Sequence, residues 1–209
     1  MPINRILTDI DRKKYKPLIA KMTKLCPEMM SRKIPRSNVQ QAFIVEIVLK
    51  LLKKNSDSRI LCVGSFEDTA SCYLGKLGIS IVNIDSQENM DVQIFHSTAP
   101  EKFDIIFATS VMEHAANDEA FLSYFADLLK EKGTGIITCD FNNDYTQGMP
   151  VPATVVRQLT EHDLTTRLPE VLKRYKCKVI GKPNWEGEND FLYQGHTYSF
   201  ATFVFRKVK

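Results

Sequence analysis

The residue types around a single glycine turn are the first feature of this 209-residue chain that suggests chemistry. The stretch RILCVGSFEDTASCYLGKLGISIVNID, residues 59–85, has apolar runs at 60–63 and 79–84 with helically spaced apolar residues between them. This pattern predicts a strand, a turn at Gly64, a helix and a second strand. The turn continues with Ser65, Phe66, Glu67 and Asp68. A pyrophosphate site needs several glycines here, whereas two carboxylates in the first helical turn would attract a positively charged ligand.

Asp85 ends the second strand, 85 − 64 = 21 residues after Gly64. A carboxylate at that position can accept hydrogen bonds from both hydroxyls of a ribose. S-adenosylmethionine carries an ammonium, a sulfonium and no phosphate, and therefore suits both the acidic turn and this carboxylate. The alternative interpretation is a structural glycine turn beside a solvated aspartate.

Four segments of the chain, in order, resemble the motifs of the class I, Rossmann-like S-adenosylmethionine-dependent methyltransferases, and most of all their small type-11 group. The segments are ILCVGSFED, VNID, FDIIFATSVMEH and LLKEKGTGIITCDF, and the resemblance covers roughly residues 57 to 207. The first segment departs from the family pattern. Cys62 stands where the family has an acid, and Phe66 and Asp68 stand where it has its second and third glycines.

The resemblance implies a three-layer α/β/α sandwich around a mostly parallel sheet of seven, or six, strands, with an antiparallel C-terminal strand and N-terminal helices. It divides the chain into a helical extension, residues 1–56, packed on a Rossmann-like methyltransferase domain, residues 57–209. It also implies S-adenosylmethionine as the cofactor and a small-molecule substrate. The residues expected at the cofactor are Gly64, Ser65, Phe66, Glu67, Asp85, Ser86, Ser97, Thr109 and Ser110.

The predicted order of the strands explains the later members of this set. Residues 103–108 form a near-continuous apolar run, as in a parallel strand covered on both faces, so Thr109 and Ser110 fall at its carboxyl end beside the glycine turn. The segment between the second and fourth strands is short, which leaves room for a third strand only at 92–95. Ser97 follows that strand and would meet the adenine.

The pair Glu113 and His114 follows the fourth strand. The resemblance places this pair near the transferred methyl group. His114 is the candidate catalytic residue, because its imidazole can accept a proton from a hydroxyl nucleophile. Equally, it can hold the loop by hydrogen bonds.

A polar stretch rich in Gly and Pro, residues 141–160, leaves the carboxyl end of the predicted fifth strand, 134–141, and long loops at this edge carry substrate contacts. The substrate-side candidates are Asp140, Asn142, Asn143, Tyr145 and Arg157. Leading helices often roof the active site in the resembled family, which adds Tyr15, Arg36 and Asn38. The segment PNWEGENDFLYQGH, residues 183–196, is predicted to be a polar loop that could close as a lid.

Two helix signals position these segments. Ser37 with Gln40 reads as a capping box ahead of an apolar-faced helix. Asn117 caps a second helix, which is expected to run through Lys132 and to stop at Gly133. The apolar stripe of this second helix is Phe121, Leu122, Phe125, Leu128 and Leu129.

Composition and charge narrow the function classes. No apolar run approaches the about 20 residues of a membrane helix, and the polar start MPINRILTDIDRKKYK lacks a signal-peptide core, so the predicted location is cytoplasmic, with no membrane partner. The five scattered cysteines form no CxxC pair, which argues against a metal site and a disulfide framework.

Residues 1–57 hold 13 Lys and Arg against 5 Asp and Glu, a charge of +8; the whole chain carries +3, so the remainder carries −5. This basic segment could steer an anionic substrate or be a solvated face, and without interleaved aromatic residues nucleic acid is not expected.

Three interpretations follow from the sequence. The first is a methyltransferase acting on a small-molecule or sugar-like acceptor. The second is a methyltransferase-like scaffold or cofactor-binding module without catalysis, because glycines and an acid of the first motif are missing. The third is a nicotinamide-dependent oxidoreductase, which the acidic turn disfavours.

Overall fold

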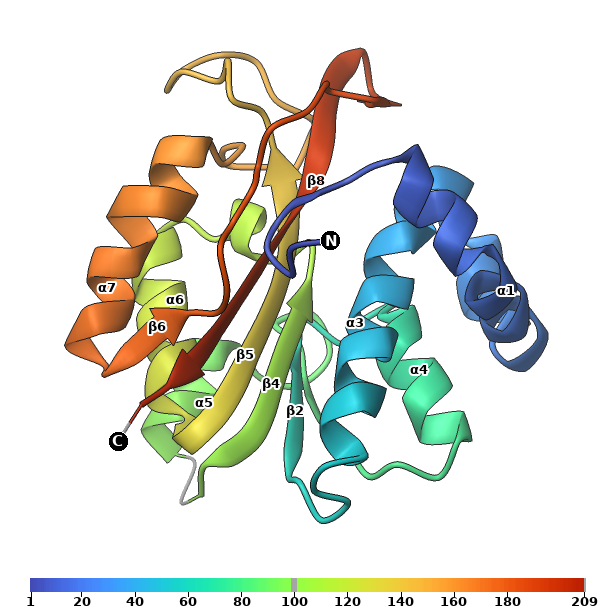
Figure 1. Ribbon diagram of the computed structural model, residues 1–209, viewed down its shortest axis with the longest axis vertical. Helices are drawn as coiled ribbons and strands as arrows, with labels where there is room; N and C mark the ends of the chain where they lie inside the picture. The colour runs from blue at the N-terminus through green and yellow to red at the C-terminus, as the bar shows by residue number, and fades with distance from the viewer. Residues whose placement is uncertain (99–100, 209) are drawn as a thin grey trace.

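The computed structural model describes residues 1–98 and 101–208 and shows a central sheet between two layers of helices (Figure 1). Four neighbouring strands are parallel and run in the order β3-β2-β4-β5. Their bounds are β2 (Ile60–Val63), β3 (Val82–Ile84), β4 (Phe103–Thr109) and β5 (Leu129–Phe141). The long strand β8 (His196–Lys207) pairs antiparallel with β5. Three short strands pair with β8: β1 (Ile6–Leu7), β6 (Cys177–Val179) and β7 (Phe191–Tyr193).

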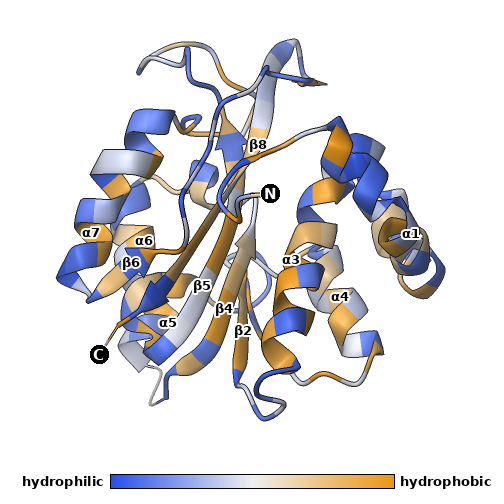
Figure 2. Cartoon of the chain, in the orientation of Figure 1, coloured by the Kyte–Doolittle hydropathy of each residue, from blue (hydrophilic) through white to orange (hydrophobic). Residues whose placement is uncertain are grey.

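Helices cover both faces of the sheet. One face carries α1 (Asp9–Leu25), α2 (Pro27–Ser31), α3 (Asn38–Leu52) and α4 (Thr69–Lys76), with the 3-10 turn η1 (Pro35–Ser37) before α3. The other carries α5 (Val92–Thr98), α6 (Asp118–Asp127) and α7 (Leu168–Arg174), with the turn η2 (Met112–His114) before α6 and the π-helical turn η3 (Asp163–Arg167) before α7. Figure 2 shows hydrophobic residues concentrated on the central strands and on α3, and many hydrophilic residues on α1 and α7. The fold is therefore the three-layer α/β/α sandwich that the sequence predicts.

The two faces of the sheet build separate apolar cores, because successive side chains of a strand point to opposite sides. In β2, Leu61 and Val63 join the core beneath α6 and α7, whereas Ile60 and Cys62 join the core beneath α3 and α4. Cys62 is fully buried, and burial raises the pKa of its thiol. The cysteine that replaces the acid of the family motif is thus a core residue in this chain.

The chain reverses its course across the sheet between β2 and β4. From β2 it continues to β3 on one side, and from β4 it continues to β5 on the other. Ligands of open α/β sheets bind where the order reverses, at the carboxyl ends of the strands. That edge is at the top of the strands in Figure 1.

The predicted third strand at 92–95 is wrong: this segment belongs to α5. The side-chain oxygen Oδ1 of Asp91 accepts a hydrogen bond from the amide of Ile94 at 2.9 Å, which is the cap that starts a helix. β3 is consequently an edge strand, and it is shorter than the apolar run at 79–84. Over the described residues the sheet has eight strands, rather than seven or six, because β1 and β7 are additional short strands that the sequence did not predict.

The predicted end of the helix after Asn117 is also wrong. α6 ends at Asp127, and Leu129 already pairs with Phe103 as the first residue of β5. Gly133 lies within this strand, where a Cβ atom would come within 2.8 Å of the Lys130 carbonyl oxygen. The glycine is therefore needed for a close approach of two backbone segments rather than for a helix end.

The capping box predicted at Ser37 does not form. Its hydroxyl donates to the carbonyl of Ile34 at 2.7 Å within η1. The capping box of this part of the chain lies at the start of α1, where Thr8 and Asp11 cap each other's backbone amides. The prediction at Ser37 fails because short polar motifs compete for several local hydrogen-bonding partners.

The edge of β8 is covered by two segments that sequence reasoning assigned to other roles. Asn4 is fully buried, its Nδ2 donates to the Val204 carbonyl at 3.0 Å, and β1 follows it in the sheet. Trp185, predicted in a polar lid, is 3% exposed, and its indole N–H donates to the Thr202 carbonyl at 3.0 Å.

A boundary between two units near residue 56 stays a prediction. Among the described residues, no helix combines the length and apolar character needed to cross a bilayer.

One ion-pair cluster ties α6 to α7 and fixes the start of α6, which borders the cavity described below. Arg167 contacts Asp118 and Asp163 at 2.6 Å each, and both carboxylates are at least nine-tenths buried. Arg167→Met should lower the free energy of unfolding by about 2–3 kcal/mol, because it leaves buried carboxylates underpaired while Arg157 still reaches Asp163.

Urea denaturation at neutral pH measures this loss. Lys173→Met is the matched control, because Lys173 forms an ion pair with Glu170 on an exposed face, where such pairs contribute at most about 1 kcal/mol. Equal denaturation midpoints for the two variants would contradict a structural role for the Arg167 cluster.

Candidate functional site

The turn after β2 is held in place by a close approach that only glycine allows. Gly64 has φ +78°, and a Cβ atom there would lie 2.3 Å from Cγ2 of Val111, which follows β4. The amides of Gly64 and Ser65 donate to the carbonyl of Ile84 at 2.8 and 3.1 Å. The carboxyl ends of β2, β3 and β4 therefore meet at this glycine.

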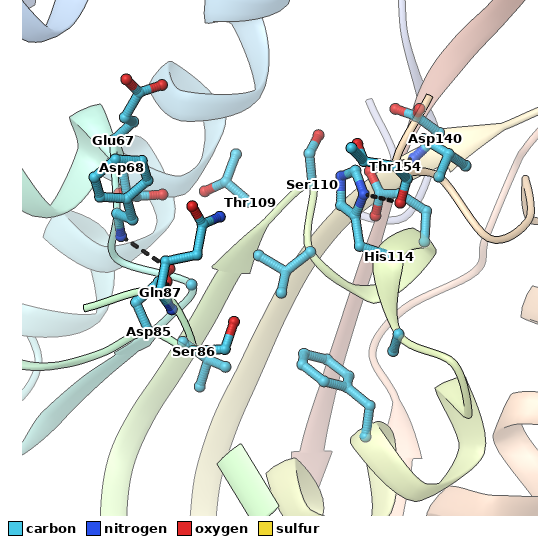
Figure 3. Close-up of a pocket in the computed structure, with 18 of the residues that line it drawn as sticks. Glu67, Asp68, Asp85, Ser86, Gln87, Thr109, Ser110, His114, Asp140 and Thr154 are labelled. Carbon is cyan, nitrogen blue, oxygen red and sulfur yellow. Dashed lines mark hydrogen bonds between the residues drawn. The ribbon is translucent and has the colours of Figure 1, made fainter. Parts of the chain in front are cut away.

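Asp85 is oriented by two backbone amides beside the turn. Its Oδ2 accepts from the amide of Phe66 at 3.0 Å, drawn as a dashed line in Figure 3, and its Oδ1 accepts from the amide of Gln87 at 2.7 Å. Its side chain borders the cavity and is 8% exposed. Each carboxylate oxygen has two lone pairs, so one remains on each for a ligand hydroxyl.

The two acidic residues of the turn have different roles. Glu67 is paired with Arg32 and Lys33 at 3.4 and 3.8 Å, so its charge is largely compensated. Asp68 caps α4 through Oδ1, which accepts from the Ser71 amide at 2.6 Å, and its Oδ2 is buried without a partner in the described part of the chain. Burial raises the pKa of Asp68. The free acceptor of the turn is therefore Asp68, which the sequence-based set of cofactor residues omitted.

A cavity of about 930 Å³ opens at this edge of the sheet. Figure 3 shows Asp85, Ser86 and Asp68 on one side, His114 and Asp140 on the other, and Thr109 and Ser110 between them. The predicted residues that line the cavity are Gly64, Phe66, Glu67, Asp85, Ser86, Thr109, Ser110, His114 and Asp140. The Phe66 side chain is 42% exposed and leaves the cavity open.

Two predicted cofactor residues lie outside this cavity. The Ser65 side chain lines a separate, smaller pocket beside α4, and the Ser97 hydroxyl donates to the Ile94 carbonyl at 2.8 Å within α5. Ser97 was misplaced because the expected third strand is a helix. The lining that follows Asp85 along the chain is instead Ser86, Gln87, Met90, Asp91, Val92 and Gln93. These residues follow the carboxyl end of β3 directly, and that position in the sequence is the feature from which they could have been predicted.

Four of the predicted substrate residues do not line the cavity. Arg157 forms an ion pair with Asp163 at 2.7 Å, and Tyr145 is 8% exposed in the packed loop. Asn142 and Asn143 hydrogen-bond within the polypeptide, to a side chain and to a backbone amide. These residues stabilise the loop at 141–160 rather than face the open space.

The substrate candidates of the first helices are likewise engaged elsewhere. The Tyr15 hydroxyl donates to a glutamate of α3, Arg36 is bonded to the backbone and side chain of Asp190, and Asn38 is 5% exposed outside the cavity. The N-terminal residues that do line it are Lys33, Ile34, Ser37, Gln40 and Gln41. Gln40 accepts a hydrogen bond from the Ser110 hydroxyl at 2.9 Å, so the N-terminal segment does cover the cavity, through other residues than predicted.

His114 has the loop-holding role that the sequence offered, and its other ring nitrogen is left for the catalytic role, which stays a prediction. Its Nδ1 lies 2.8 Å from the carbonyl oxygen of Thr154, as Figure 3 shows. A carbonyl can only accept, so Nδ1 carries the hydrogen, and in the neutral imidazole Nε2 keeps its lone pair. The residue holds the loop and still offers a proton acceptor, although its part in catalysis stays a prediction.

A buried pair of carboxyl groups beyond Ser110 is the feature that sequence reasoning missed. Glu113 is fully buried, Asp140 is 4% exposed, and Oε1 of Glu113 accepts from the Asp140 amide at 3.2 Å. Burial, and the proximity of the two acids, raise the pKa of Asp140 well above its usual value, and burial raises that of Glu113. In the described part of the chain, neither carboxylate forms an ion pair. The signal was Glu113 itself, which the sequence analysis treated only as the neighbour of His114.

Aromatic side chains form the wall next to this pair. Phe191 and Tyr193 of β7 and Tyr198 and Phe200 of β8 line the cavity. Ring centroids of Phe191 lie 4.6 Å from Phe200 and 5.2 Å from Tyr198. Burial and then the charges of the acid pair raise the pKa of the Tyr198 hydroxyl, which therefore stays protonated at neutral pH. The β7–β8 hairpin thus closes the far end of the cavity.

Comparison with known proteins gives matches among solved structures alone. No protein-family model matches the chain, and neither does any curated protein sequence. One structural match is the Burkholderia thailandensis 1,6-didemethyltoxoflavin-N1-methyltransferase with bound 1,6-didemethyltoxoflavin and S-adenosylhomocysteine: TM-score 0.60, 13% identity, 94% of this chain and 90% of that one. The CurJ carbon methyltransferase matches with TM-score 0.59 and 15% identity over 90% of this chain. The [4+2]-cyclase SpnF matches with TM-score 0.51 and 13% identity over 81% of this chain and 82% of its own.

These likenesses define the class of fold. The chain has the fold of the class I S-adenosylmethionine-dependent methyltransferases. It spans 61% of the CurJ chain and 62% of TehB from Haemophilus influenzae, a further match, so it is shorter than these two structural neighbours. Identities of this size support the fold and leave the reaction to be argued from the site.

The acid pair should govern how stability depends on pH. Because the folded-state pKa values of Glu113 and Asp140 are raised, the folded protein holds protons there more tightly than the unfolded chain. Their contribution to stability is complete below the unfolded-state pKa of about 4 and is lost as pH rises through the raised values. The free energy of unfolding should fall between pH 4 and pH 8 in the parent protein. In Asp140→Asn this fall should be smaller by about 1 kcal/mol or more.

Denaturant titrations of both proteins across that pH range measure the slope. The exposed Asp144, four residues further along in the loop that follows β5, provides the matched control Asp144→Asn, which should keep the parent slope. Parallel pH profiles for the parent and Asp140→Asn would show that the pair does not titrate as described.

Proposed function

We propose that this chain is a S-adenosylmethionine-dependent methyltransferase acting on a small-molecule or sugar-like acceptor. The observation that carries the proposal is Asp85. Two backbone amides orient its carboxylate, which keeps a free lone pair on each oxygen, and it lines a cavity of about 930 Å³ at the switch point of the sheet. That arrangement suits the two hydroxyls of a ribose.

The polar atoms at the turn fit the remaining parts of the cofactor. The unpartnered Oδ2 of Asp68 is an acceptor for an ammonium group, and Lys33 lines the same part of the cavity as a cation for a carboxylate. A cavity of this volume accommodates a drug-sized ligand. The one-glycine turn with Glu67 and Asp68 suits a cationic ligand better than a pyrophosphate, which argues against a dinucleotide.

The chemistry requires little of the protein beyond position. The cofactor would supply a methyl group already activated by its sulfonium. The chain's own residues bind and orient the acceptor, keep water away, and take up a proton where the acceptor has one to lose. The Nε2 atom of His114 is the group placed for that proton.

The predicted cytoplasmic location stays a prediction.

The second candidate is a methyltransferase-like scaffold or cofactor-binding module without methyl transfer. Its support is the degraded first motif, with Cys62 in the core, and a structural match whose name gives a cyclisation rather than a methylation. Calorimetry with S-adenosylmethionine, S-adenosylhomocysteine and NADH tests which cofactor binds. Micromolar binding of the first two supports the methyltransferase or a cofactor-binding module, binding of none supports a scaffold without cofactor, and binding of NADH alone would return the oxidoreductase.

Replacing Asp85 tests the carboxylate that carries the proposal. Asp85→Ala should weaken S-adenosylhomocysteine binding by about 1.5–3 kcal/mol, roughly 10- to 150-fold, because ribose hydroxyls lose a charged acceptor. Calorimetric titration measures the change. Asp57→Ala removes an exposed aspartate just before β2 and should leave the affinity unchanged. Unchanged affinity in Asp85→Ala itself would mean that the ribose binds elsewhere.

A further inference from the structure

The buried acid pair has no part in the methyl transfer as proposed so far. Asp140 lies across the cavity from Asp85, beyond Ser110 (Figure 3), and Glu113, which also lines the cavity, is hydrogen-bonded to the Asp140 amide. A sulfonium methyl group needs no acid for its activation, and His114 already offers a proton acceptor. Yet Oε2 of the fully buried Glu113 has no hydrogen-bonding partner in the described part of the chain. An unpartnered buried acceptor in a binding cavity points to a ligand group.

Among the described residues no lysine or arginine forms an ion pair with Glu113 or Asp140, and the neighbouring His114 is the one cation that acts on the pKa of Glu113. Buried carboxylates are normally paired with a cation or a metal. The backbone of Arg157 contacts that of Glu113, since the Arg157 amide donates to the Glu113 carbonyl at 3.3 Å. The Arg157 guanidinium, however, donates to Asp163 at 2.7 Å. Arg167 is held by Asp118 and Asp163 in the same cluster. In the free protein the raised pKa values mean that bound protons offset the charge of the pair, and a cationic ligand could take the place of those protons.

The aromatic wall narrows the chemical class of that ligand. Phe191, Tyr198 and Phe200 line the same end of the cavity and pack against one another with centroids 4.6 to 5.8 Å apart. Aromatic faces attract cations, and they also pack well against flat or apolar groups. Carboxylates beside aromatic faces are a combination that favours an organic cation over a neutral polyol.

We propose that the methyl acceptor is an organic base, an amine or amidine on a flat or apolar body, which binds as its cation to Glu113 and Asp140. This inference rests on the proposed methyl transfer and names its substrate class. It gives the acid pair a specificity-determining role and the β7–β8 hairpin the role of a wall for the apolar body. The acceptor nitrogen would lie on the side of Ser110 opposite to Asp85.

The step balances without a further reactant. The bound cation loses a proton from nitrogen to a carboxylate of the pair, and the N–H bonding electrons become the nitrogen lone pair. That lone pair forms the new N–C bond to the methyl carbon as the C–S bond breaks, with its electron pair remaining on sulfur. The products are a methylated ammonium ion, S-adenosylhomocysteine and a protonated carboxyl group, which returns its proton to water when the product leaves.

Binding of two matched probes to the full chain saturated with S-adenosylhomocysteine tests the assignment. The probes are benzylamine, a cation at neutral pH, and benzyl alcohol, its neutral counterpart of the same shape. Ligand-detected NMR titration should show benzylamine binding about tenfold or more tighter than benzyl alcohol. Equal affinity for the two probes, or no binding of benzylamine, would overturn the inference.

Isosteric variants of the two acids test whether Glu113 and Asp140 cause the preference for the benzylammonium cation over benzyl alcohol. Asp140→Asn and Glu113→Gln should each weaken benzylamine binding about tenfold, leave benzyl alcohol unaffected, and keep S-adenosylhomocysteine affinity within about twofold. Asp144→Asn is the matched control and should bind both probes as the parent does. Thermal melts establish that each variant is folded, and removal of one buried acid should not lower stability. A cation preference that survives in both variants would also overturn the inference.

The two proposals fail in different ways. If S-adenosylhomocysteine does not bind, the proposed function falls, and with it the identification of the cation as a methyl acceptor, whatever benzylamine does. If S-adenosylhomocysteine binds and the probes are not distinguished, the methyltransferase stands and only the acceptor class is wrong.

Discussion

The contact between Gly64 and the side chain of Val111 is the constraint on which the site depends. It lets the turn after β2 and the exit of β4 approach more closely than any side chain at residue 64 would permit. With the turn in that position, its amides reach the carbonyl of Ile84, and the amide of Phe66 reaches Asp85. One missing Cβ atom thereby aligns three strand ends, and the single glycine that the sequence retains is the one that geometry requires.

The parts of the fold that sequence could predict are those set by local pattern. The apolar run of β4, the strand–turn–helix at Gly64 and the position of Asp85 after β3 follow from periodicity and spacing. The end of α6 did not follow, because Leu129 satisfies a helical stripe and a strand equally well and its pairing with Phe103 decides the matter. The same limit applies to Asp91, whose cap on α5 outweighs the β propensity of the residues after it.

Long-range contacts decided which polar residues reach the cavity. Arg157 and Asn142 lie in the expected loop, but their side chains are bound to other parts of the chain: Arg157 pairs with Asp163, and Asn142 is hydrogen-bonded to Gln158 and Asn189. Gln40 belongs to a helix predicted as a roof, and it reaches Ser110 because α3 packs across the sheet. Which face of a helix looks into a cavity is set by tertiary packing, and single-sequence patterns carry no information on it. Aromatic residues of β7 were missed for the same reason.

Four carboxyl groups at this edge of the sheet differ mainly in what surrounds them. Asp85 accepts two backbone amides and remains a hydrogen-bond acceptor, whereas Asp68 uses one oxygen as a helix cap and keeps the other free. Glu113 and Asp140 face each other in an apolar setting with no cation supplied by the described chain. In the proposed function, the cofactor would be held by hydrogen-bond acceptors in fixed positions. The methyl acceptor would need a neighbouring group that can take up or release a proton. The different surroundings of the four acids match the division of the cavity into a cofactor side and a methyl-acceptor side that we propose.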